Sequence, residues 1–191
     1  MQRHRNGGFT RTMAAAATGL AVGVVGSRLL SPMFAGVTGS MRASLGGDPF
    51  ERLMRDHRQI ETMLDEMLRS SEQPLARRTA IFVALKRTLG KHALAEEDVV
   101  YPILHEEAGA ADAARQLYAE HGEMKVHLYE LENALKSDAG WAQHVASLRA
   151  VIGRLIREEE QVHFPKLHAL MDKDRGRTLA GLIRREEALI V

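Results

Sequence analysis

The first chemical signal in this chain of 191 residues is one histidine and two glutamates spaced to meet a metal ion. His92 and Glu96 are four positions apart, which places both side chains on one face of a helix, roughly 6 Å apart along its axis. Glu159 lies in a second, similar segment and supplies a matching carboxylate. Two carboxylates in an apolar interior are costly unless protons or cations neutralise them, so a divalent metal between these side chains resolves the conflict.

The similarity between the two segments is an internal repeat. Residues 92–105 align with residues 155–168 without a gap, and in both copies a glutamate pair precedes an aromatic residue and a proline by the same interval. The pairs are Glu96-Glu97 with Tyr101-Pro102, and Glu159-Glu160 with Phe164-Pro165. The repeat predicts two similar helical hairpins with a pseudo-twofold site between them.

The donor set narrows the choice of metal. The chain has no cysteine, so disulfides, thiolate metal sites and cysteine nucleophiles are all excluded. Imidazole and carboxylate ligands without thiolate suit iron or manganese, with zinc as a further option. Helical bundles that hold two irons do so with carboxylates that bridge between helices, and Glu96 and Glu159 are compatible with that arrangement.

Four segments have apolar residues at intervals of three and four, which predicts four long amphipathic helices that position these residues. The apolar residues of each segment form a stripe along one face of its helix. The first helix is expected to begin at Asp48-Pro49, an N-cap followed by a proline at the first helical position. Each stripe places candidate ligands on its apolar face: His57 on the first, His92 and Glu96 on the second, His121 on the third and Glu159 on the fourth. The fourth stripe is expected to run Trp141, Val145, Leu148, Ile152, Leu155, Glu159 and Val162.

The predicted fold is therefore all-α, an antiparallel up-down-up-down four-helix bundle with a short C-terminal helix and an N-terminal apolar extension. Residues 48–175 form the bundle, and residues 176–191 hold the last helix, over Thr178–Leu189. Residues 1–47 have a basic start and then an apolar stretch rich in small residues. Two readings of this extension stay open: a membrane anchor or export signal, and a soluble segment of a cytoplasmic protein.

The overall charge excludes one class of partner. The formal net charge is only +1, so the chain has no strong field for nucleic acid. A homo-oligomer and membrane association through residues 1–47 are both compatible with the sequence.

At these residues the sequence resembles the hemerythrin HHE cation-binding family. The matching elements are Asp56-His57, His92-x-x-x-Glu96 with Tyr101-Pro102, Glu120-His121, and Glu159 with Phe164-Pro165. The resemblance covers about residues 48–170 and implies a four-helix bundle with a non-haem di-iron centre. It also implies oxygen binding, oxygen or redox sensing, or the handling of iron or nitric oxide. Carried across residue by residue, it makes His57, His92, Glu96, His121 and Glu159 the expected ligands.

The sequence departs from the family pattern at one position. The repeat places the family's remaining histidine at residue 155, where this chain has leucine. His163 is the nearest substitute, but it lies about 12 Å along the helix from Leu155 and only one turn from Glu159. Three alternatives stay open: a site shifted toward His163, a five-ligand site completed by water, and a site with one metal or none.

The other polar residues of the repeats have simpler interpretations. Tyr101 is expected to pack near the end of the bundle, with contact with the metal as the alternative. Tyr101 and His163 are also the inward candidates for a proton donor. Glu97, Glu158 and Glu160 are expected to face solvent, with Glu97 as an alternative partner beside His92 and Glu96.

The leading functional hypothesis is a hemerythrin-like di-iron protein that binds O2, or responds to oxygen, nitric oxide or peroxide. A missing imidazole opens a coordination position, which favours redox sensing over oxygen carriage. The alternatives are a di-iron enzyme with peroxidase, catalase-like or nitric oxide reducing activity, and an iron-storage or structural interaction bundle. The sequence favours a metal-binding carrier or sensor over a dedicated enzyme.

Overall fold

The computed structural model describes residues 47–137 and 140–190, and every regular element in this part of the chain is helical. The prediction of an all-α fold is confirmed for these residues. The helices are α1 (Pro49–Arg69), α2 (Leu75–Ala95), η2 (Glu96–Val100), α3 (Tyr101–Glu106), α4 (Ala111–Ser137), α5 (Trp141–Glu158), η3 (Glu159–His163), α6 (Phe164–His168) and α7 (Lys173–Glu187). The apolar stretch of the N-terminal extension lies outside the described residues. Among the described helices, none is both long and apolar enough to cross a membrane.

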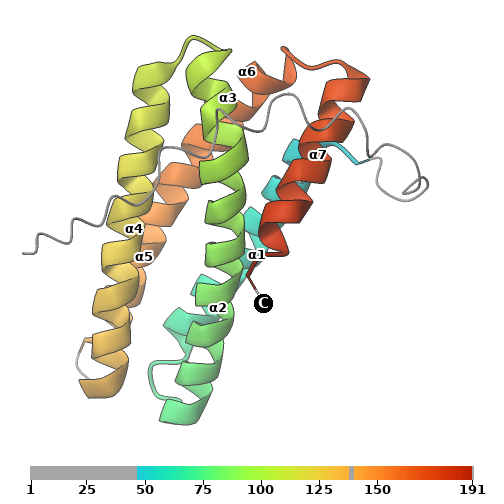
Figure 1. Ribbon diagram of the computed structural model, residues 1–191. Coiled ribbons are helices and arrows are strands. Elements are labelled where there is room, and N and C mark those ends of the chain that lie inside the picture. The colour runs from blue at the N-terminus through green and yellow to red at the C-terminus, as the bar shows by residue number, and fades with distance from the viewer. Residues whose placement is uncertain (1–46, 138–139, 191) are drawn as a thin grey trace, which may run out of the picture. The chain divides into compact units, whose positions relative to one another are not determined.

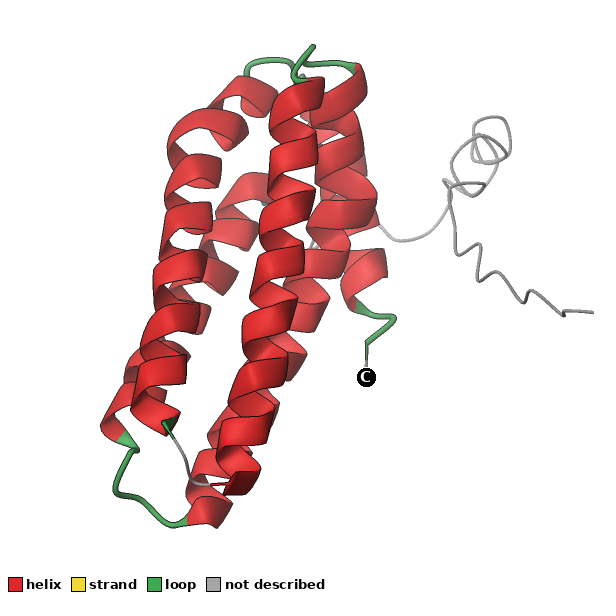
Figure 2. Ribbon diagram, turned by 90° about the vertical axis from the view of Figure 1, so that its left-hand side faces the viewer, coloured by secondary structure: helices red, strands yellow, loops and turns green. Residues whose placement is uncertain are grey.

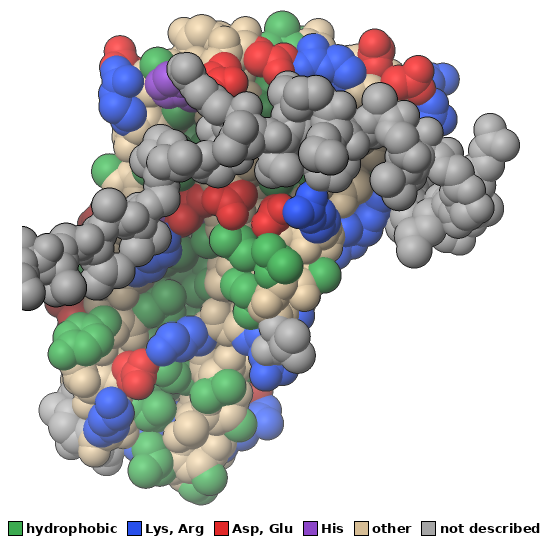
Figure 3. All heavy atoms as spheres, viewed as in Figure 1, with side chains coloured by type: hydrophobic (Ala, Val, Ile, Leu, Met, Phe, Trp, Pro, Cys, Tyr) green, Lys and Arg blue, Asp and Glu red, His purple; other side chains and the backbone are tan. Residues whose placement is uncertain are grey.

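Four long helices surround the core. Helix α1 packs against α2 and α5, and α4 packs against α5 and α2, so that the four lie side by side (Figures 1 and 2). Buried aliphatic and aromatic side chains from all four helices fill the space between them. On the face drawn in Figure 3, acidic and basic side chains are interspersed with hydrophobic ones, in keeping with a net charge near zero.

The predicted start of the first helix is confirmed. Pro49 is the first residue of α1, and the side chain of Asp48 accepts a hydrogen bond of 2.9 Å from the backbone N–H of Phe50. Proline suits the first helical turn because its missing N–H would have had no partner there.

Both repeats contain a short π-helical turn immediately before the aromatic-proline pair. Turn η2 ends with the N–H of Tyr101 donating to the carbonyl of Glu96, and η3 ends with the N–H of Phe164 donating to the carbonyl of Glu159. A proline ring within an α-helix clashes with the carbonyl four residues before it, and a widened turn relieves that clash. The repeat in the sequence therefore becomes a repeat of the same backbone distortion.

These turns shift which residues face the core. The fourth apolar stripe was predicted to end inward at Val162, but Val162 is 54% exposed and the next residue, His163, is buried. A π turn spaces hydrogen-bonded residues five apart instead of four, so the inward face moves on by one position. The prediction for Val162 is wrong because it assumed an uninterrupted α-helix.

The C-terminal helix α7 begins at Lys173, five positions before the predicted start at Thr178. The side chain of Asp172 caps it by accepting hydrogen bonds from the backbone N–H groups of Asp174 and Arg175. It packs against α1, α2 and η2, and Arg52 of α1 forms an ion pair with Glu187 near its end.

Replacing Ile183 with alanine tests how much α7 contributes to stability. The Ile183 side chain is fully buried against the bundle, whereas its neighbour Leu182 is 39% exposed. We expect Ile183→Ala to lower the free energy of unfolding by about 2–5 kcal/mol, because a buried side chain leaves a cavity. Leu182→Ala is the control, with an expected change within about 0.5 kcal/mol. Urea denaturation measures both, and equal losses would contradict the packing of α7.

Candidate metal centre

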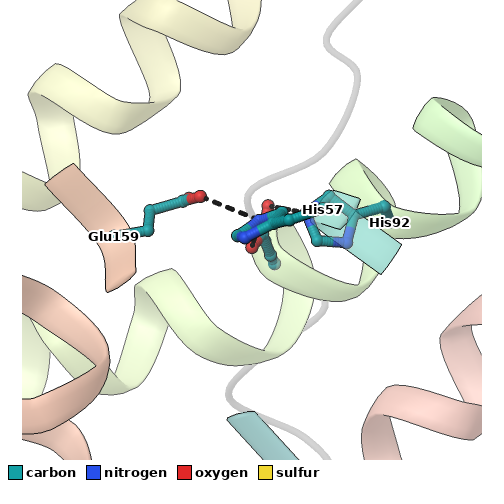
Figure 4. Close-up of side chains that lie close together, drawn as sticks. His57, His92 and Glu159 are labelled. Carbon is teal, nitrogen blue, oxygen red and sulfur yellow. Dashed lines mark ion pairs between the residues drawn. The ribbon is translucent and has the colours of Figure 1, made fainter. Parts of the chain in front are cut away.

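Four side chains from three long helical segments converge in the interior. His57 comes from α1, His92 and Glu96 from the end of α2 and the start of η2, and Glu159 from the start of η3. One ligand atom from each lies within 4.8 Å of those of the others, and all four residues are buried. Figure 4 shows the carboxylate of Glu159 directed toward His57 and His92. The sequence alone had placed these residues inward.

The distances place both carboxylates between imidazole rings. Nε2 of His57 is 3.3 Å from Oε2 of Glu159 and 3.8 Å from Oε1 of Glu96. Nε2 of His92 is 3.2 Å from Oε2 of Glu96. The helical spacing of four residues therefore brings His92 and Glu96 together as predicted from the sequence.

Several of these polar atoms are buried without a hydrogen-bond partner. They are both carboxylate oxygens of Glu96, Oε2 of Glu159 and Nε2 of His57. Unsatisfied buried polar atoms are rare because each one loses its interaction with water and gains nothing in return. Inward nitrogen and oxygen atoms in this state fit a metal ion with N and O ligands, such as iron, manganese or zinc.

The protonation of the cluster without a metal follows from its charges. Burial alone would lower the pKa of His57, but the carboxylates of Glu159 and Glu96 outweigh it and raise the pKa to about 11. Burial also acts to lower the pKa of His92, but the charge of Glu96 is the chief cause of a net rise to about 9. Burial and the charge of Glu96 raise the pKa of Glu159. Protons thus occupy the imidazoles in the absence of a cation, and a metal ion must displace them.

His121 faces the same cluster from α4, beside the hydroxyl of Tyr101. Its Nε2 is 3.5 Å from Oε2 of Glu96 and 2.9 Å from the hydroxyl of Tyr101. That hydroxyl also donates a hydrogen bond of 2.5 Å to Oε1 of Glu159. The sequence favoured packing of Tyr101 near the end of the bundle over contact with the metal, but its hydroxyl lies within the candidate centre.

Carboxylates also hold the outer nitrogens of two of the histidines. Nδ1 of His57 is 2.8 Å from Oε1 of Glu160, and Nδ1 of His121 is 2.9 Å from Oε1 of Glu97. Such contacts fix the ring orientation and leave Nε2 free to face a metal. The sequence predicted that Glu160 faces solvent, and linked Glu97 to His92 instead of His121. In each glutamate pair, the first residue points inward and the second holds a histidine of another helix.

Leu155 lies where the repeat would place a further histidine. Its side chain is buried and lines a small cavity together with the rings of His57, His92 and His121. The cavity has a volume of about 10 Å³, and the rest of its wall is apolar. A space of this size holds about one water-sized molecule.

His163 is buried but lies outside the group of four. Its Nε2 is 3.3 Å from Oε1 of Glu158, and Nδ1 has no hydrogen-bond partner among the described residues. Of the predicted ligands, the structure therefore brings together His57, His92, Glu96 and Glu159, places His121 against Glu96, and pairs His163 with Glu158.

Substitution of His163 tests whether it contributes to metal binding. We expect His163→Gln to keep the metal content of the folded protein, because its neighbour in the structure is Glu158. His92→Gln is the matched comparison and should lose metal. Elemental analysis after identical purification measures both, and loss of metal in His163→Gln would restore His163 as a ligand.

A comparison with protein families bears directly on this geometry. The model of the hemerythrin HHE cation-binding domain matches residues 48–167, well over half of the chain. The chain belongs to this family. Comparisons with curated proteins and with solved structures gave no match. The hemerythrin HHE match spans α1 through η3, the elements that supply the inward histidines and glutamates. A hemerythrin-like metal-binding domain therefore accounts for both the fold and the buried cluster.

Proposed function

We propose that this chain is a hemerythrin-like non-haem di-iron protein that binds O2, or responds to oxygen, nitric oxide or peroxide. The helices α1, α2, α4 and α5 would form the antiparallel up-down-up-down bundle of that class. When bound, iron would supply the electrons for reversible binding or reduction of such a small ligand. His57, His92, Glu96 and Glu159 would hold the first iron, and His121 would contribute to the second.

The observation that carries this proposal is the position of the two carboxylates between separate imidazole groups. Oε2 of Glu159 faces His57, whereas Oε1 faces Tyr101 on the side of His121. Oε2 of Glu96 lies between His92, at 3.2 Å, and His121, at 3.5 Å. Carboxylates with this placement suit the bridging role that they have in helical bundles with two irons.

The small cavity beside the histidines supports the proposal that the physiological ligand is a small molecule. Its volume of about 10 Å³ and its apolar wall, which includes Leu155 and Ile152, suit a diatomic molecule better than an organic substrate. The chain's own contribution is to exclude bulk water and to keep the rings of His57 and His121 oriented through Glu160 and Glu97.

Reconstitution with iron tests the proposal. The purified chain is loaded with ferrous iron without oxygen, desalted, and examined for iron per chain and for its visible spectrum under nitrogen, oxygen and nitrogen again. We expect about two irons per chain and a spectral change with oxygen that reverses for a carrier, or persists until reductant is added for a sensor. A folded protein that retains no iron would overturn the proposal.

A further inference from the structure

The hydroxyl of Tyr101 occupies a position that a packing role does not require. The residue is 1% exposed, and its oxygen lies 2.9 Å from Nε2 of His121 and 2.5 Å from Oε1 of Glu159. The equivalent residue of the other repeat, Phe164, is also buried and has no hydroxyl. Burying a hydroxyl costs free energy unless it is hydrogen-bonded, and here both hydrogen-bond partners belong to the candidate centre.

The two halves of the candidate centre are unequal in imidazoles. The half on the side of α1 has two, from His57 and His92, together with the two carboxylates. The half on the side of α4 has only His121, because Leu155 takes the place of the repeat's second histidine. The ring of Phe164 stacks on His57 in the complete half, whereas the hydroxyl of Tyr101 reaches His121 in the half that lacks a histidine. The tyrosine hydroxyl thus lies in the half of the centre that has one histidine fewer.

The atoms around the Tyr101 hydroxyl are close enough to share one ion. Metal bonds of about 2.1 Å at right angles place adjacent ligand atoms roughly 3 Å apart. The tyrosine oxygen is 2.9 Å from Nε2 of His121, which matches this spacing. Its contact of 2.5 Å with Oε1 of Glu159 is shorter because the phenol proton lies between the two oxygens. Nε2 of His121 is in turn 3.5 Å from Oε2 of Glu96. On the basis of the proposed di-iron function, we infer that Tyr101 is a ligand of the second iron and replaces the histidine that Leu155 displaces.

The π-helical turn explains how the fold delivers this ligand. Turn η2 hydrogen-bonds the N–H of Tyr101 to the carbonyl of Glu96, so the tyrosine follows the inward glutamate by one widened turn. In a regular α-helix, a residue five positions after Glu96 would not share its face. The widened turn therefore sets Tyr101 beside the carboxylates. Metal binding would release the phenol proton to solvent and leave the phenolate on the iron.

Tyr101→Phe tests this inference directly, because it removes only the hydroxyl and creates the residue that the other repeat already has. We expect the iron content to fall from about two per chain to about one, and the visible absorption of ferric phenolate to disappear. Tyr118→Phe is the matched control. Tyr118 packs edge-on against Tyr101, but its hydroxyl donates to the backbone carbonyl of Glu97. Removing the Tyr118 hydroxyl should therefore change neither the iron content nor the phenolate absorption.

A double variant separates ligand loss from structural damage. Tyr101→Phe combined with Leu155→His should recover about two irons per chain without the phenolate absorption, because the repeat's histidine is restored. A wild-type protein with one iron and no phenolate absorption would overturn the inference and leave an iron-binding domain in place. Two irons and an unchanged spectrum in Tyr101→Phe would also overturn it. A wild-type protein that binds no iron would instead overturn the proposed function on which the inference rests.

Discussion

Glu96→Gln is expected to remove nearly all iron from the protein. Glu96 is fully buried, and its two oxygens face the inward nitrogens of three histidines on three helices. Glutamine keeps the shape of the side chain but removes its negative charge, and a neutral amide does not compensate a divalent cation in an apolar interior. Loss of an outer carboxylate costs about 10–100-fold in metal affinity, so loss of this inward one should cost more than about 100-fold. Iron per chain after dialysis measures the effect.

Glu97→Gln is the matched control, one residue further along the same helix. Glu97 lies outside the ligands, holds Nδ1 of His121 at 2.9 Å and forms an ion pair with Lys125. We expect it to weaken the binding of one iron by about 10–100-fold and to leave the other in place. If Glu96→Gln and Glu97→Gln lost iron equally, Glu96 would not have the bridging role that its position indicates. Circular dichroism establishes that both variants are folded.

The sequence predicted the helical fold and the inward histidines because both follow from local periodicity. Apolar residues at intervals of three and four define a helix face, and His57, His92 and His121 fall on those faces. The start at Asp48-Pro49 depends on capping chemistry within a few residues, which the sequence displays directly. Features that depend on one turn of helix were therefore accessible without a structure.

The features that the sequence did not settle depend on the π turns and on pairing between helices. The sequence named Tyr101 and His163 as inward candidates but favoured packing of Tyr101 near the bundle end and predicted Val162 to face inward. A single extra residue in the turn before Pro102 brings Tyr101 to the centre, and the same change before Pro165 exposes Val162 while His163 is buried. Periodicity analysis assumes a constant helix and cannot locate such a change. The repeated Glu-Glu-x-x-x-aromatic-Pro pattern was the available signal. The contacts of Glu97 with His121 and of Glu160 with His57 join residues far apart in sequence, so they required the assembled bundle.

Removing the metal is expected to lower the melting temperature by a large amount without unfolding the domain at room temperature. A ligand that binds only the folded state at a thousandfold excess over its dissociation constant contributes about 4.1 kcal/mol, or about 10 °C for a domain of this size. Thermal denaturation of the iron-loaded protein, with and without a strong chelator, measures the difference. Glu96→Gln, which should already lack iron, is the control and should show no response to the chelator.

The domain should survive this loss because its buried charges compensate one another when the metal leaves. Protons return to His57 and His92, whose pKa values are raised to about 11 and about 9, and they balance the charge of Glu96, whose pKa the same histidines lower. Burial and Glu96 raise the pKa of Glu159, which favours its neutral form and reduces the repulsion between the two carboxylates. If the chelator unfolded the domain outright, this compensation would be absent, and the metal would be required for folding as well as for function.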